Sequence, residues 1–582
     1  MIINELKEEI AGQINSCIKK IYKNKNIKEL TASDITDAPG SFGDFSFPCF
    51  SLSPQLKKSP KSIAEELSEK TEKTKQIVST ASINGYLNFT VDKKNIFLKL
   101  IEEINSKKIT KFDKKNKRVM IEYSSPNTNK PLHIGHLRND IIGMSISNLL
   151  SEAGYEVIKA NLYNDRGIGV SEVIYDYLKY HKDEEPNIKP DHYIGMLYSE
   201  FNAELKDNEL LMDDVTEILK RWENNDPEII SVWEKIRSWV LEGYKETYKL
   251  FGTKFDVEYF ESDLYRKAKE IVDEAYKKGI LKKTENNALI APLDEFGLPD
   301  KIIVKSNGTA LYVTTDIYLA KKKFEDFKLD KSIYVVASEQ DLYFKQLFKI
   351  LEKMKLADPE KLYHLSYGLV SLPTGRIKSR EGTTADIDAL YEETYNFAKE
   401  QIIERNSEIK EDRLSERASK IALAAMKFFI AKVDPSKNMK YNPKESLSFE
   451  GETGPYLLYT YARIKSIFRR LDISCNQETI KEIKNNIKKS HIILDEIQQR
   501  IIMQAIILPE AVNNSAESYK PNIMSRYLID LSQLYNSYYH STSIINETDT
   551  TIKNTGILIS YVVSSILKKG LALLDIETLE EM

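Results

Sequence analysis

The sequence predicts an α/β protein built on a Rossmann-type parallel sheet, with a helical insertion in that sheet, a small α/β domain before it and an all-α domain after it. Three observations favour this fold class. The chain has 582 residues, which is too long for one domain. Residues 118–154 follow the pattern strand, polar turn, helix, which places ligands at the carboxyl edge of a parallel sheet. Residues 455–582 carry apolar stripes at helical spacing.

Residues 1–110 are expected to form the small α/β domain. Its first segment is amphipathic and charged, and the segment SPKSIAEELSEK begins with the Ser-Pro pair typical of a helix start. The segment GYLNFTV is predicted to be a strand that closes this domain. The lysine-rich stretch KKITKFDKKNKR lacks periodicity, so we expect a linker there.

Residues 111–390 are expected to hold the parallel sheet. Its first strand alternates through Val119, Ile121 and Tyr123 and ends before Pro126, because proline cannot continue a central strand. Further strands are predicted in EVIKANLYNDRG, GTALYVTTDIYLA, SIYVVASEQ and YHLSYGLVSLP. Residues from about 170 to 290 are mostly helical in pattern and too long for an ordinary crossover, so they are predicted to be an insertion. A helical stem at 391–454 leads into the all-α domain at 455–582.

Composition limits the function classes. A net charge of -4 argues against nonspecific coating of nucleic acid but allows a local basic surface. The three cysteines, Cys17, Cys49 and Cys475, are far apart, so neither a disulfide framework nor a zinc site is expected, and no metal site of any kind. They favour a reducing cytoplasm. No signal peptide and no apolar run of about 18 residues is visible, so we expect no membrane span.

The polar turn after the first strand carries Lys130, His133, Gly135 and His136. Two imidazoles at a helix start can donate to phosphate oxygens, and Lys130 adds a point charge. Gly135 leaves room for a flat base against the backbone. A polyphosphate is therefore the predicted ligand. The alternative is a pair of surface histidines that cap a helix, but the strand before the turn and the helix after it favour the ligand.

Two further groups of residues carry candidate chemistry. The loop from Gly375 to Gly382 holds three cations and suits a pyrophosphate leaving group, although a solvated basic turn would look the same. A second group combines two carboxylates, a phenol and two amides at predicted strand ends, which could bind a guanidinium. Its members are Glu122, Asn127, Tyr312, Asp316 and Gln340. For any one of them alone, a satisfied polar group at a strand end is the simpler interpretation.

The chain resembles the class I aminoacyl-tRNA synthetases, and most closely the arginyl-tRNA synthetases. The turn HIGH matches the first family signature, SSPNTNKPLHIGHLR and NDRG resemble the arginine enzymes, and RIKSR stands where the second signature, KMSKS, belongs. The likeness extends through GDFSFPCFSLSPQLKKSPKSIAEEL, INGYLNFTV, LYVTTDI, YVVASEQDLYFKQLF, LSFEGETGPYLLYTYARI and GLALLDIETLEEM. It therefore covers essentially the whole chain.

The resemblance implies an arginine–tRNA ligase. The carboxylate of L-arginine would attack the α-phosphate of ATP to give arginyl-adenylate and pyrophosphate, and the arginyl group would pass to the 3′-terminal ribose of tRNA(Arg). It implies ATP with Mg²⁺, no zinc, no membrane, a cytoplasmic monomer, and arginine activation that needs bound tRNA. The main alternative is a noncatalytic tRNA-binding paralogue, which only the altered RIKSR loop supports. A small nucleotidyltransferase is disfavoured by the large insertion and the helical C-terminal half.

The resemblance also assigns roles to residues. His133 and His136 would stabilise the phosphate and Gly135 would back the adenine, whereas Glu122, Asn127, Tyr312, Asp316 and Gln340 match arginine-binding positions. In the second signature Arg376 takes the first position, Lys378 replaces the usual serine and Ser379 replaces the second lysine. Lys130 is the position that compensates in this family. Charge stabilisation of the triphosphate thus falls to Lys130 with Lys378 or Arg376, and the choice between these two loop cations stays open.

The terminal domains would hold tRNA. The N-terminal domain resembles the one that contacts the tRNA elbow, and the C-terminal domain the one that binds the anticodon. Candidate contacts in the latter are Tyr459, Tyr461, Arg463, Lys465, Arg469 and Arg470. The tyrosines could stack on unpaired bases, but helix packing is the simpler interpretation for most of them.

Overall fold

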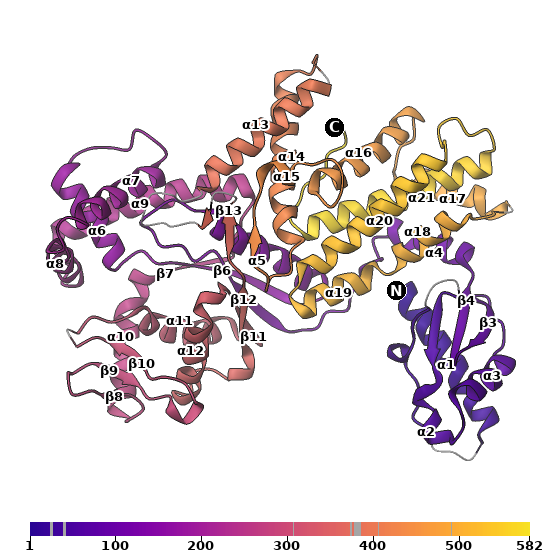
Figure 1. Cartoon of the computed structure of the whole chain (residues 1–582), viewed down its shortest axis with the longest axis horizontal. Coiled ribbons are helices and arrows are strands. Elements are labelled where there is room, and N and C mark those ends of the chain that lie inside the picture. Colours follow the sequence, from indigo (N-terminus) through magenta and orange to yellow (C-terminus); the bar gives the residue numbers. More distant parts are fainter. Residues whose placement is uncertain are drawn as a thin grey trace.

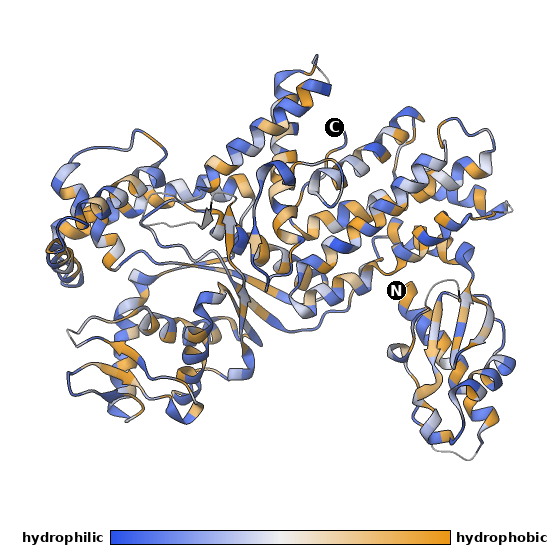
Figure 2. Ribbon diagram, viewed as in Figure 1, coloured by the Kyte–Doolittle hydropathy of each residue, from blue (hydrophilic) through white to orange (hydrophobic). Residues whose placement is uncertain are grey.

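The structure, a computed structural model, describes residues 1–23, 27–38, 42–306, 308–372, 375–376, 386–405, 407–490 and 492–582, with only the backbone at 375–376. Figure 1 shows the N-terminal domain at one end of the molecule, below the C-terminal helical bundle, and the insertion helices at the other end. Apolar residues lie along the central strands and alternate with polar ones along the outer helices (Figure 2).

The N-terminal domain is the predicted α/β unit. Its four-stranded sheet has the order β1 (Thr36–Asp37), β2 (Phe45–Pro48), β4 (Tyr86–Val91), β3 (Ile77–Ile83), and it packs with α1 (Ile2–Ile21), α2 (Ser53–Leu56) and α3 (Pro60–Lys70). Ser59 caps α3 by accepting a hydrogen bond from the Ser62 amide, which confirms the helix start. Helix α4 (Lys93–Asn105) then packs against the C-terminal bundle.

The central sheet is parallel, with five strands. Its order is β12 (Leu362–Tyr367), β11 (Lys331–Ala337), β5 (Arg118–Glu122), β6 (Glu156–Tyr163), β7 (Val257–Phe260). The chain builds outward from β5 to β7 and then starts again at β11 on the other side of β5. The strand order therefore reverses between β5 and β11, where Rossmann-type sheets bind ligands. Helix α5 (Ile134–Glu152) packs against β5, β6 and β11, and the predicted fold class is confirmed.

One predicted strand is wrong, and a second is correct only in its first part, which forms β12. The segment GTALYVTTDIYLA forms the start of helix α11 (Tyr312–Phe327), because Val313, Ile317 and Ala320 recur at helical spacing and are buried in a small core with α10 (Glu261–Lys277) and α12 (Asp341–Lys353). Its β-branched residues favoured a strand locally, but this packing outweighs them. The end of YHLSYGLVSLP leaves the parallel sheet as β13 (Val370–Leu372), which pairs with β14 (Gly375–Arg376) and β15 (Met439–Lys440).

The predicted helical insertion is interrupted by strands. It begins with α6 (Ile168–Tyr180), α7 (Pro190–Leu205), α8 (Leu211–Glu223) and α9 (Pro227–Phe251), as expected. Strand β7 then returns to the edge of the central sheet, and after α10 a small antiparallel sheet follows, formed by β8 (Lys282–Lys283), β9 (Leu289–Ala291) and β10 (Lys301–Val304). Trp233, Trp239 and Tyr244 on α9 are buried, so this aromatic face of the helix packs in the core.

The C-terminal region is helical apart from β15. Its helices are α13 (Ile387–Arg405), α14 (Glu411–Ala431), α15 (Pro443–Ser446), α16 (Gly454–Arg470), α17 (Gln477–Lys489), α18 (Glu496–Ile506), α19 (Leu508–Ser518), α20 (Pro521–Ser541) and α21 (Thr550–Leu573). Among the helices that the structure describes, α21 is long and apolar enough to cross a membrane. It is mostly buried and packs against α16, α17, α18 and α20, as the core helix of a bundle does.

Candidate active site

The turn between β5 and α5 is strained and held in place from three elements. Ser124 and Ser125 have φ angles of 68° and 46°, which L residues adopt only when neighbouring contacts fix them. The Ser124 amide donates to Asn139 Oδ1 of α5 at 2.8 Å, and the Ser125 amide donates to Asn161 Oδ1 of β6 at 3.0 Å. Tyr244 of α9 donates to two further carbonyls of the turn, those of residues 127 and 130, at 2.8 and 2.6 Å.

His133 and His136 cap the start of α5. Nδ1 of His133 accepts from the Gly135 amide, and Nδ1 of His136 accepts from the His133 amide, both at 3.1 Å. The two rings lie 3.9 Å apart. Burial and the Lys130 charge lower the pKa of His133 to about 4, and burial and His133 lower the pKa of His136 well below its usual value. Both imidazoles are therefore neutral at pH 7, and because Nδ1 accepts, each carries its proton on Nε2.

Gly135 is needed by this arrangement. A Cβ atom at this position would lie 2.9 Å from the ring of His133. The two interpretations of the turn are thus compatible, because the histidines cap the helix through Nδ1 and still present two N–H donors at its N-terminus.

The predicted acidic and polar group divides into a buried and an exposed part. Glu122 ends β5 and is 7% exposed, and its carboxylate accepts from Lys323 of α11. Asp316, on α11, accepts from the Tyr343 hydroxyl of α12. Burial raises the pKa of Asp316 to about 6, opposed by the Tyr343 hydrogen bond and reinforced by the charge of Glu122. Asp316 and Glu122 therefore share one electrostatic environment.

The other three members lie nearer the surface. Tyr312 begins α11 and is 51% exposed, with its hydroxyl 3.5 Å from the Cβ position of Gly167 in the NDRG turn. Asn127 is exposed in the turn after β5, and Gln340 is exposed at the start of α12. The expectation that all five lie at strand ends is wrong for Tyr312 and Asp316, because their segment is a helix.

A cluster of charges joins the histidine turn to the insertion. The backbone of Asp386 forms a β-bridge with His133, and Asp388 accepts from Lys189, from His192 at 3.0 Å and from Thr247 at 3.1 Å. Hydrogen bonding to Asp388 raises the pKa of His192. Residues 377–385, which include Lys378, lie outside the described residues, as does the side chain of Arg376.

Two groups of described residues could surround a cation. They are Asp191, His192, Asp388 and Asp176, His181, Glu200. In the first group Lys189 already supplies a positive charge beside Asp388 and lies 3.4 Å from Asp191. In the second group His181 lies 2.9 Å from Glu200 and 3.6 Å from Asp176, and its pKa is raised because its hydrogen bonds to Glu184 and Glu200 outweigh burial.

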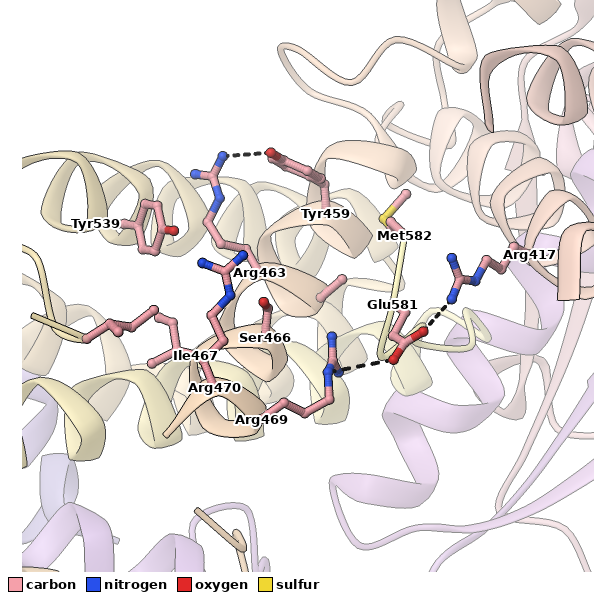
Figure 3. A pocket seen from close by; sticks show the side chains of 12 residues that line it. Arg417, Tyr459, Arg463, Ser466, Ile467, Arg469, Arg470, Tyr539, Glu581 and Met582 are labelled. Carbon is pink, nitrogen blue, oxygen red and sulfur yellow. Dashed lines mark hydrogen bonds and ion pairs between the residues drawn. The ribbon is translucent and has the colours of Figure 1, made fainter. Parts of the chain in front are cut away.

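A second candidate site is a pocket of about 340 Å³ in the C-terminal bundle (Figure 3). The Arg463 guanidinium lies 4.6 Å from the ring centroids of both Tyr459 and Tyr539. Arg417 and Arg469 pair with Glu581 near the chain end, and Arg470 completes the wall.

The residues predicted to contact tRNA are only partly gathered at this pocket. Tyr459, Arg463, Arg469 and Arg470 line the pocket, but Lys465 pairs with Glu580 and Tyr461 is buried in helix packing.

Comparison with known proteins covers the whole chain. The family model "tRNA synthetases class I (R), catalytic domain" matches residues 100–442, "DALR anticodon binding domain" matches 457–582, and "Arginyl tRNA synthetase N terminal domain" matches 4–91. An arginine–tRNA ligase of Parabacteroides distasonis is 35% identical, with 99% of this chain and 100% of the relative covered. One from Bacteroides thetaiotaomicron is 37% identical over 92% of both chains. The chain belongs to the arginyl-tRNA synthetase family.

Solved arginyl-tRNA synthetases share the fold. The Thermus thermophilus enzyme aligns with a TM-score of 0.75 at 23% identity, covering 99% of this chain and 100% of that one. The Plasmodium falciparum enzyme aligns with a TM-score of 0.78 at 20% identity, over 99% of both chains. The resemblance to the arginyl-tRNA synthetase family is thus confirmed. The domain boundaries and the roles of individual residues stay predictions.

Several residues of this candidate site were not predicted from the sequence. Asn139, Asn161 and Tyr244 hold the strained turn, and Asn161 and Tyr244 lie well beyond it in sequence, on β6 and α9. Lys323 and Tyr343 contact the two buried carboxylates. One signal was available for Lys323, because it follows Asp316 by seven residues and so shares its face of a helix. That signal was hidden because the segment was taken for a strand.

Proposed function

We propose that the chain activates L-arginine with ATP and transfers the arginyl group to the 3′-terminal ribose of tRNA(Arg). The observation that carries this proposal is that β5 ends in Glu122, whose charge acts on the buried carboxyl group of Asp316, and leads directly into the turn that presents His133 and His136 as two neutral donors at a helix start. The family to which the chain belongs supports the same reaction. The nucleotide enters as the magnesium complex of ATP.

The histidine turn acts on the α-phosphate. Nε2–H of His133 and of His136 donates to the phosphate oxygens, where negative charge develops as the arginine carboxylate attacks. Because both rings are neutral, they donate at any pH well above 4 without changing charge. Lys130, with Arg376 or Lys378, stabilises the triphosphate and the departing pyrophosphate. The backbone at Gly135 and the N-terminus of α5 support the adenine and the phosphate.

The buried carboxylates select arginine. The guanidinium pairs with Asp316, while Glu122, Asn127, Tyr312 and Gln340 complete the polar surface around the amino acid. A substrate without a guanidinium leaves a buried carboxylate unpaired, which costs on the order of 10⁴ in discrimination at sites of this kind. With a penalty of that size, the proposed reaction needs no separate editing domain.

The terminal domains position tRNA. We assign the anticodon loop to the pocket of Arg463, Tyr459 and Tyr539, because arginines beside tyrosine rings can bind phosphates and stack on unpaired bases. The N-terminal domain contacts the tRNA elbow. The protein acts as a cytoplasmic monomer away from membranes, in line with its free thiols at Cys17, Cys49 and Cys475.

The test is ATP–pyrophosphate exchange across the amino acids, with and without tRNA(Arg). We expect exchange with arginine only, strongest with tRNA present. Exchange with another amino acid would refute the assignment, and tRNA binding without any exchange would establish the noncatalytic alternative.

A further inference from the structure

Lys323 is a buried cation directly behind the proposed arginine site. Its side chain has no exposure to solvent, and its ammonium group donates to Glu122 at the carboxyl end of β5. The same ammonium lies 4.4 Å from the ring centroid of Tyr334, which is the register partner of Glu122 on β11. Burial opposes the charge on Lys323, but the Glu122 carboxylate outweighs it and raises the pKa of the lysine. Lys323 therefore stays charged.

Lys323 and Asp316 lie on the same face of α11. They are seven residues apart, which is about two helical turns. The two residues are also coupled electrostatically. The charge of Lys323 lowers the pKa of Asp316, whereas the charge of Glu122 raises it. The groups that face Asp316 come from four elements: Glu122 of β5, Lys323 of α11, Tyr343 of α12 and Glu261 of α10.

The charges of this cluster match those of the substrate. At pH 7 Glu122 and Asp316 contribute one negative charge each and Lys323 one positive charge, while burial raises the pKa of Glu261 to about 8 and keeps it protonated, so these groups sum to a single negative charge. Arginine at neutral pH carries two positive charges and one negative charge, a net of one positive charge. Without Lys323, two buried carboxylates would face each other, and like charges in a low-dielectric site favour protonation of one of them.

We propose that Lys323 is a positioning residue for arginine selection, which neutralises and orients Glu122 so that Asp316 is the carboxylate that receives the guanidinium. This inference rests on the proposed function, because it assumes that Asp316 and Glu122 face arginine. It goes beyond that function by adding a residue that contacts no substrate and by dividing the work between the two carboxylates.

The test compares Lys323→Met and Lys323→Arg with the wild type in tRNA-dependent ATP–pyrophosphate exchange. We expect Lys323→Met to raise the KM for arginine at least tenfold at pH 7 while the KM for ATP changes less than twofold. Lys323→Arg keeps the charge and should stay within threefold of the wild type. The matched control is Lys322→Met, because Lys322 is the neighbouring lysine on α11 and pairs with Asp326 at the surface. It should leave both KM values unchanged.

A pH profile separates this role from a purely structural one. In Lys323→Met, Glu122 and Asp316 would share a proton, so the rise in the KM for arginine on acidification should begin at least one pH unit higher than in the wild type. A lower melting temperature with an unchanged KM and pH profile would overturn the proposal.

Lys323→Met leaves Glu122 buried without its partner and can fail to fold. The double variant Glu122→Gln/Lys323→Met removes both charges and provides the second measurement. We expect it to fold and, because Glu122 can no longer share a proton with Asp316, to show the wild-type onset of the rise in the KM for arginine on acidification. A folded double variant in which that rise still begins at least one pH unit higher would overturn the inference. Failure of the proposed function would look different, because the wild type itself would then show no arginine-dependent exchange.

Discussion

The cluster of Glu122, Asp316 and Lys323 beside β5 and the pocket lined by arginine side chains in the C-terminal bundle use charge in opposite ways. In the first, Lys323 and Glu122 are paired out of contact with water, with side-chain exposures of 0% and 9%. In the second, Arg469 and Glu581 are both 44% exposed. The buried charges act in a medium of low dielectric, where an unpaired group is costly, whereas the exposed ones are screened by salt.

This difference matches the ligands that we assign to the two sites. A free amino acid has few atoms, so each contact must discriminate strongly, and burial makes an unpaired carboxylate expensive. A tRNA makes many contacts, so each can be weak and solvent-exposed. We therefore expect substitutions in the cluster to change specificity abruptly and those in the pocket to change affinity gradually.

The largest effect should come from Asp316→Ala. Removing one partner of a buried charge pair costs about 4 kcal/mol, so kcat/KM for arginine should fall on the order of 1,000-fold. The affinity for tRNA, measured by filter binding, should change little. Glu325→Ala is the matched control on the same helix, because Glu325 is exposed and pairs with Lys321. An equal loss of arginine and tRNA binding in Asp316→Ala would contradict the division between the two sites.

His136→Asn should separate capping from catalysis. The asparagine Oδ1 can replace Nδ1 as the acceptor for the His133 amide, but no donor replaces Nε2–H. We expect kcat for adenylate formation to fall about 100-fold with little change in melting temperature. His136→Ala, which also removes the cap, should in addition lose about 1 kcal/mol of stability. Full activity in His136→Asn would remove the imidazole from the reaction.

Lowering the pH should weaken arginine binding at the carboxylate cluster and leave tRNA binding at the C-terminal pocket unchanged. Asp316 has a pKa of about 6 without substrate, and only its carboxylate form pairs with a guanidinium. Below pH 6 the KM for arginine should therefore rise about tenfold per pH unit. The guanidinium groups of the pocket stay protonated throughout. Direct tRNA binding measured over the same range provides the comparison, and a parallel loss there would point to general unfolding.

The smallest effect should come from Arg463→Ala. A half-buried cation stacked on aromatic rings contributes about 1 kcal/mol, so the KM for tRNA should rise about fivefold. The dependence of tRNA affinity on the logarithm of salt concentration should become shallower by about one unit. Arg526→Ala serves as the control, because Arg526 lies on α20 and is paired with Glu452 and Asp530. An unchanged salt dependence in Arg463→Ala would argue against a phosphate contact.

The histidine turn was the part of the site most accessible from sequence. Strand, turn and helix are adjacent in the chain, so local patterns suffice to predict that His133 and His136 lie at the start of a helix. Their protonation could not be predicted, because it depends on burial and on which backbone amides their Nδ1 atoms accept from. Glu122 was placed correctly at a strand end for the same local reason.

The region around Asp316 was harder because tertiary packing overrides local preference. Tyr312, Val313, Thr314 and Thr315 favour a strand, yet the apolar spacing through Ile317 and Ala320 places them on a helix against α10 and α12. Strand β7 was missed because four residues between long helices give little periodic signal. Tyr343 could be identified only once α11 and α12 were placed in space.

The register of the central sheet has a consequence for how the protein is made. Val119 of β5 pairs with Lys331 of β11, which follows it by 212 residues in the chain. At roughly 5–20 residues per second, a ribosome needs roughly 10–40 s to deliver that length. During this interval β6 can cover one edge of β5 while the other edge, beside Glu122, has no strand to pair with, and an open edge of this kind invites pairing with other chains. Lys323 leaves the ribosome just before β11 does. Glu122 therefore gains its charge partner at almost the same time as β5 gains its second neighbouring strand.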